Sequence, residues 1–104
     1  MTKDDITAWA LKNGWRMIGG APCLTKPSAP KEAIVRLTLK ATVVALEVKR
    51  PAGKWEQVAS AAYAKVEADP ETGVPAGLGF EKVPSFSRLM QDNKDQQVFG
   101  GFGG

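Results

Sequence analysis

The spacing of hydrophobic residues changes once within the stretch from Ala33 to Val66. Up to about Val48, apolar and polar residues mostly alternate, which is typical of strands. From Trp55 the apolar residues instead follow one face of a helix: Trp55, Val58, Ala59, Ala62, Tyr63 and Val66. We therefore predict strands followed by a helix over Trp55–Val66 that covers them. A hairpin strand starting at Trp55 is the alternative, because the turn Arg50–Lys54 precedes it.

The alternating part divides into two strands. From Glu32 to Leu39 the apolar face carries Val35, Leu37 and Leu39, and the opposite face carries Ile34, Arg36, Thr38 and Lys40. The pattern then slips by one residue, so that Val44, Leu46 and Val48 carry the apolar face. Such a slip would turn the core face toward water unless the chain reverses. We predict a turn near Lys40–Thr42 and antiparallel neighbouring strands.

The first quarter of the chain predicts a helix and a strand. Asp4–Lys12 has a helical apolar stripe, and Asn13-Gly14 stops it because glycine readily takes the left-handed conformation. Trp15–Ile18 is predicted as a strand, which Gly19-Gly20 interrupts by a bulge or tight bend. Cys23–Lys26 resumes the extended structure.

The last third contains shorter elements. Asp69–Gly73 has the residue types of a tight turn, Leu78–Val83 is predicted as a short edge strand, and Ser85–Gln91 as one helical turn. We predict a single α+β domain over residues 3–91, with an N-terminal helix, a three- to four-stranded mostly antiparallel sheet and a helix packed on one face. The Gly/Phe tail over residues 92–104 is predicted to be disordered.

Composition removes several classes of site. The chain has 104 residues, no histidine and one cysteine, Cys23. An intramolecular disulfide and histidine-based nucleophilic catalysis are therefore impossible within it. No stretch of 18 apolar residues is present, so we expect no membrane span and a cytoplasmic protein. We assign no catalytic residue, metal ligand or cofactor.

Charge is distributed unevenly and predicts a candidate surface. Residues 1–54 hold ten Lys/Arg and four Asp/Glu, a net charge of +6, whereas residues 55–104 carry −3. The predicted registers direct four cations away from the core, where they could follow phosphates: Arg16, Arg36, Lys40 and Lys49. The alternative is an ordinary solvated sheet face. No aromatic side chain is expected among these cations, which disfavours base stacking.

Three further features have structural and functional interpretations. The glycines of Gly73–Gly79 could bind an anion, but no phosphate-loop lysine follows, and a turn is favoured. Glu67, Asp69 and Glu71 could bind a cation, but a solvated acidic turn is favoured. In the tail, Phe99 and Phe102 could anchor a partner protein, against a frayed terminus.

The sequence leaves three functions open. A non-catalytic interaction module that binds a macromolecule is favoured, with an unidentified protein preferred as partner and no membrane. A nucleic-acid-binding domain that uses the basic sheet face is the first alternative. A subunit of an enzyme with carboxylate, lysine or Tyr63 chemistry is the second. The oligomeric state is not predicted.

Overall fold

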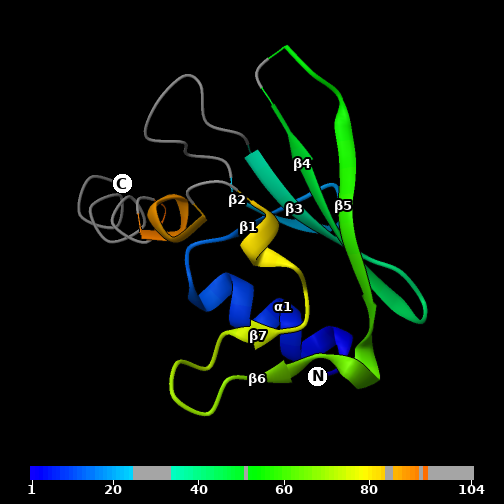
Figure 1. The fold of residues 1–104 in the computed structure, drawn as a ribbon, viewed down its shortest axis with the longest axis vertical. Coiled ribbons are helices and arrows are strands. Elements are labelled where there is room, and N and C mark those ends of the chain that lie inside the picture. The colour runs from blue at the N-terminus through cyan, green and yellow to red at the C-terminus, as the bar shows by residue number, and fades with distance from the viewer. Residues whose placement is uncertain (25–33, 51, 84–85, 92, 94–104) are drawn as a thin grey trace.

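An N-terminal helix precedes a five-stranded antiparallel sheet. The computed structural model describes residues 1–24, 34–50, 52–83, 86–91 and 93. Helix α1 (Lys3–Lys12) leads into strands that lie in sequence order across the sheet: β1 (Arg16–Ile18), β2 (Ala21–Leu24), β3 (Ile34–Leu39), β4 (Val43–Lys49) and β5 (Trp55–Ala62). Figure 1 shows the twisted sheet with β4 and β5 at one side and β1 at the other.

The rest of the chain folds back over one face of this sheet. A 3-10 turn, η1 (Tyr63–Lys65), is followed by the short pair β6 (Glu67–Ala68) and β7 (Pro75–Ala76), and then by η2 (Phe80–Lys82). A helix follows over residues 86–91, and residue 93 is also helical. These segments lie on the same side of the sheet as α1 (Figure 1). The predicted α+β class is confirmed, although the sheet has five strands rather than three or four.

Helix α1 is held at both ends by local contacts. The Thr2 hydroxyl accepts a hydrogen bond from the Asp5 backbone N–H at 3.1 Å, and the Asp5 carboxylate accepts one from the Thr2 N–H at 2.9 Å. This reciprocal capping box satisfies two donors that a helix start would otherwise leave unpaired. Asn13 ends the helix, and Gly14 follows with a φ of 90°, as the sequence predicted.

Two tight turns determine the register within the β1–β2 pair and within the β3–β4 pair. Gly19 and Gly20, with φ values of 59° and 83°, connect β1 to β2, a conformation that suits a two-residue hairpin loop. Between β3 and β4, the Lys40 N–H donates to the Val43 carbonyl at 2.9 Å. Leu37 therefore pairs with Leu46, and the predicted turn and antiparallel register are confirmed.

The core lies between the sheet and the segments that cover it. The covered face of the sheet buries five of the six predicted apolar side chains of β3 and β4 together with Leu24, and Leu39 is partly buried. The covering layer supplies Ile6 and Ala10 from α1, and later buried residues close the remaining area: Val66, Leu78, Phe80, Val83 and Leu89. Trp15 joins both layers, because its ring contacts Phe80 and its indole Nε1 donates to the Met90 sulfur at 3.0 Å.

The predicted helix over Trp55–Val66 is wrong, because Trp55–Ala62 is the edge strand β5. A β-bulge explains the misleading spacing. Ala59 pairs with Leu46, but the next β4 residue, Glu47, pairs with Gln57, so Val58 is the extra residue. One added residue breaks the period of two, and the apolar positions then fall at helix-like intervals. The cover that this helix was expected to provide comes from α1 and from residues after Val66.

The predicted edge strand over Leu78–Val83 is also wrong. Gly79 has a left-handed φ of 87°, which interrupts extended backbone, and η2 follows it directly. A Cβ built on Gly79 would lie only 2.5 Å from the Ala59 Cβ, so the backbone at Gly79 packs directly against β5. This close approach brings Leu78 and Phe80 into the core, which requires a turn rather than a strand.

Two predicted segments lie largely outside the described residues. These are the loop from Lys26 to Lys31 and most of the tail that begins at Asp92. Asn93 is described, and it is buried with its side-chain amide donating to the Leu89 carbonyl at 2.8 Å. Among the described residues, no helix has the length and apolar character needed to cross a bilayer.

The packing of Gly79 against β5 is testable by comparing two alanine substitutions. Gly79→Ala and Gly73→Ala both put a side chain on a left-handed backbone, which costs about 1–2 kcal/mol. Only Gly79→Ala also clashes with Ala59, because Gly73 has no heavy atom within 4 Å of an added Cβ. We expect the free energy of unfolding in urea to fall by about 1–3 kcal/mol more for Gly79→Ala. Equal losses would contradict the packing.

Candidate functional site

The face of the sheet turned away from α1, here called the outer face, gathers all four cations that the sequence singled out. One row of paired residues crosses all five strands: Arg16, Cys23, Arg36, Glu47 and Gln57. Lys49 pairs with Ile34 and Trp55 in the next row on this same face. Lys40 follows β3 two positions after Thr38, and so has the same side-chain direction.

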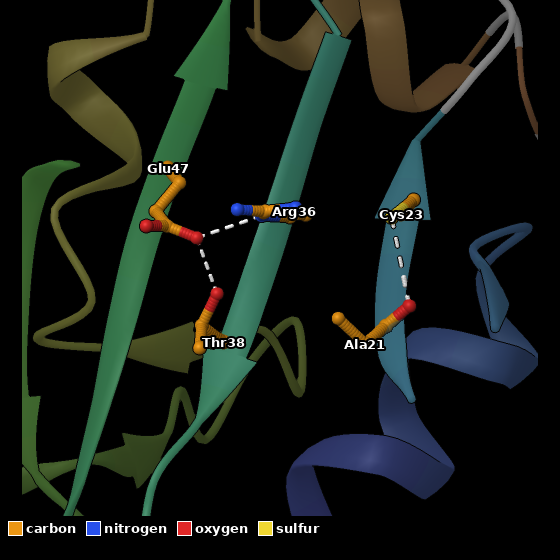
Figure 2. A network of polar contacts seen from close by, with 5 residues as sticks. All are labelled: Ala21, Cys23, Arg36, Thr38 and Glu47. Carbon is orange, nitrogen blue, oxygen red and sulfur yellow. Dashed lines mark hydrogen bonds and ion pairs between the residues drawn. The ribbon is translucent and has the colours of Figure 1, made fainter. Parts of the chain in front are cut away.

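Arg36, Glu47 and Thr38 form a polar network at the centre of the outer face. The Arg36 Nε donates to Glu47 Oε1 at 2.7 Å, and the Thr38 hydroxyl donates to the same carboxylate oxygen. Figure 2 shows the Arg36 and Thr38 side chains on β3 both pointing to this Glu47 oxygen on β4. The side chains of Arg36 and Glu47 are 31% and 17% exposed, so the ion pair is shielded but reachable from solvent.

Trp55 brings an aromatic ring to the same network. The Arg36 guanidinium carbon lies over the Trp55 ring, 4.1 Å from its centre, a cation–π geometry. Trp55 is half-buried on the edge strand β5. The expectation that no aromatic residue lies among the cations is therefore wrong at this position. That expectation rested on Trp9 and Trp15 lying in the core, while Trp55 was assigned to a helix that faces the core.

The network keeps the Glu47 carboxyl ionised. Burial alone would raise the pKa of Glu47, but the hydrogen bonds from Thr38 and Arg36 outweigh it, with the positive charges of Arg36 and Lys40 adding to them. The pKa of Glu47 therefore lies below its ordinary value. An ionised carboxylate held in this way fixes the orientation of the Arg36 guanidinium.

Among the described residues, acidic side chains lie almost entirely away from the outer face. Among the described acidic residues, Glu47 is the one on the outer face, and the others lie on α1, the inner side of β5 or the segments after it. Within the described part of the chain, Arg16, Lys40 and Lys49 form no ion pair, whereas Arg36 pairs with Glu47 and Arg50 with Glu56. The outer face is therefore cationic.

Cys23 lies in the same row, between Arg16 and Arg36. Its side chain is buried, and its thiol donates weakly to the Ala21 carbonyl at 3.5 Å (Figure 2). Burial raises the pKa of the Cys23 thiol, although the nearby charge of Arg36 opposes this. A raised pKa leaves little thiolate at neutral pH, the form in which a cysteine acts as a nucleophile.

The acidic segment and the glycine segment belong to the β6–β7 pair and the turns beside it. Asp69 Oδ1 accepts hydrogen bonds from the backbone N–H groups of Glu71 and Thr72, which lowers the pKa of Asp69. No group of three or more candidate ligands with metal-binding geometry occurs among residues that the structure describes. Gly79 serves the packing against Ala59 described above. Phe99 and Phe102 lie outside the described residues, so their role as partner anchors stays a prediction.

Tyr63, the residue named for possible enzymatic chemistry, has a structural contact. Its hydroxyl donates to the Lys40 carbonyl at 2.7 Å, which links η1 to the β3–β4 turn. Burial raises the pKa of Tyr63. The enzyme-subunit alternative stays a prediction.

Sequence reasoning missed Glu47 and Trp55 as members of the site. Glu47 was within reach, because a two-residue turn at Ala41-Thr42 places it opposite Arg36 by counting outward from the turn. Trp55 could not be found in this way, since its position depends on the bulge in β5.

Comparison of the chain with protein-family models, with curated proteins and with solved structures finds no match.

The contribution of Glu47 to stability predicts a pH dependence. Its folded pKa is lowered, so its stabilising effect is present above the ordinary value of 4.5 and disappears as the pH falls through the folded pKa. We expect Glu47→Gln to lower the free energy of unfolding at pH 7, with the difference from wild type shrinking as the solution is acidified below the folded pKa. Urea titrations at several pH values measure this. A difference that stays constant with pH would contradict the ionised network.

Proposed function

We propose that the chain is a non-catalytic module that binds nucleic acid through the outer face of its sheet. The main support is that four cations lie on this face, where Glu47 is the one carboxylate among the described residues: Arg16, Arg36, Lys40 and Lys49. A polyanion such as nucleic acid binds favourably to such a surface, because each phosphate that the protein neutralises releases counterions. The sequence pI of about 9.2 agrees with an anionic partner.

The arrangement of the cations supports a long anionic chain over a small ligand. Arg16 and Arg36 are two strands apart, about 10 Å, and Lys40 lies four positions along the chain from Arg36, about 13 Å. Cations spread at this scale on an open face match several phosphates of one polymer. A single small anion could contact only one or two of them.

A charge-reversal pair tests the proposal. The double variant Arg16→Glu/Lys49→Glu should weaken binding to nucleic acid at low salt by at least about ten-fold. It should also reduce the slope of log K against log salt by roughly 0.7–0.9 for each phosphate that the variant no longer neutralises. Fluorescence anisotropy with labelled DNA and RNA at several salt concentrations measures both quantities.

The control changes the same net charge elsewhere on the molecule. Lys3→Glu/Lys82→Glu alters α1 and η2, which lie on the opposite side of the sheet from the outer face. This variant should bind almost as well as wild type. Equal weakening in both double variants would show that only net charge matters, and absence of wild-type binding at low salt would reject the proposal.

A protein partner remains the second candidate, and one feature favours it. β5 is an edge strand of eight residues without lysine or proline, the residues that commonly protect such edges. The Tyr63 N–H donates to Thr42, so by alternation the Ser60 N–H points away from β4 and could bond an added strand.

Strand addition predicts a different response from charge-mediated binding. Ser60→Pro removes a donor that β4 does not use, and prolines are tolerated on edge strands. The substitution should abolish recruitment of a partner protein in a salt-resistant pull-down, and it should leave nucleic-acid binding unchanged. A partner retained equally by Ser60→Pro and wild type would exclude strand addition at this edge.

A further inference from the structure

The Arg36 guanidinium is held in one orientation while part of it stays available. Its Nε is bound to Glu47, and its central carbon lies over the Trp55 ring. Within the described residues, its two terminal amino groups make no hydrogen bond or ion pair. Two parallel N–H donors on a fixed guanidinium fit two oxygens of one phosphate. Arg36 is therefore oriented in advance for a phosphodiester.

Trp55 lies next to this phosphate-binding position. The ring is on the same face as Arg36 and pairs across the strands with Lys49, a second cation. Bases stack on aromatic rings regardless of their identity, because every base has a π-face. Because Arg36 covers one face of the half-buried Trp55 ring, a base next to a phosphate bound at Arg36 would stack on the opposite face.

The width of the sheet predicts different contacts with a single strand and with a duplex. Five strands span four spacings of about 4.8 Å, or about 19 Å. The major groove of B-DNA is only about 12 Å wide, so this face cannot enter it. A duplex would therefore offer phosphates alone, with its bases already stacked on each other, whereas a single strand can also place a base on Trp55.

We propose that the outer face selects single-stranded nucleic acid, with Arg36 binding a phosphate and Trp55 stacking an adjacent base. Glu47 and Thr38 act as positioning residues that hold Arg36. This inference rests on the proposed function and names the class of nucleic acid. Charge alone would favour the duplex, which has the higher charge density. A preference for the single strand therefore requires the stacking contact.

The first experiment compares labelled oligo-dT and oligo-U with a blunt duplex of equal length, using the full chain at low salt. Wild type should bind the single strands more tightly than the duplex. Trp55→Ala should weaken single-strand binding by about five- to a hundred-fold, and Trp55→Phe should retain most of it. Neither substitution should change duplex binding. Thermal melting verifies that each variant is folded at the assay temperature.

The second experiment uses variants for which electrostatics and geometry predict opposite outcomes. Glu47→Ala removes a negative charge from the cationic face, so electrostatics alone would tighten binding. If Glu47 positions Arg36, single-strand binding weakens instead. Arg36→Lys keeps the charge but removes the planar pair of donors, so it should also weaken single-strand binding.

The outcomes distinguish the two levels of the proposal. Equal effects of Trp55→Ala on single strand and duplex, or tighter single-strand binding by Glu47→Ala, would overturn the inference. Nucleic-acid binding by the outer face would then still stand if Arg16→Glu/Lys49→Glu weakens it. Binding that is insensitive to the charge-reversal variant, or no binding of any probe, would reject the proposed function itself.

Discussion

The register of β3, β4 and β5 is the constraint on which the rest of this structure depends. Side chains of a strand alternate between faces, so a slip of one residue exchanges the core face and the outer face. The short turn between Lys40 and Val43 sets Leu37 opposite Leu46 on one side and Arg36 opposite Glu47 on the other. The same pairing thus builds the hydrophobic core and the polar network.

The bulge in β5 adjusts this register at one point. If Val58 paired with Glu47 in a regular ladder, Trp55 would pair with Arg50 and take the side-chain direction of Leu46 and Val48, toward the core. With the bulge, Trp55 pairs with Lys49 and lies on the outer face, where it contacts Arg36. Bulges often re-aim a side chain next to functional sites, and this one supplies the aromatic ring on the cationic face.

The inner and outer faces of the sheet differ in their charged groups. The inner face is covered by α1 and by segments whose acidic residues are solvated or capped, such as Asp5 and Asp69. The outer face keeps its cations apart from those carboxylates. Glu47 is the exception, and it does more than neutralise Arg36, because its carboxylate is itself held by Thr38 and so restricts the guanidinium. Rigidity at this position would reduce the entropic cost of the nucleic-acid binding that we propose.

Local signals in the sequence determined the capped helix α1, the hairpin of β3 and β4 and the direction of the four cations. Each of these depends on residues close together in the chain, such as Thr2 with Asp5, or on strict alternation around a short turn. The strand identity of Trp55–Ala62, the turn at Gly79 and the contact of Trp55 with Arg36 were decided only by the tertiary structure. Alanine-rich sequence with one bulge has helical spacing, and pairing along β4 overrides that local preference because it hydrogen-bonds the side of β5 that faces β4 and packs Ala59 against Gly79.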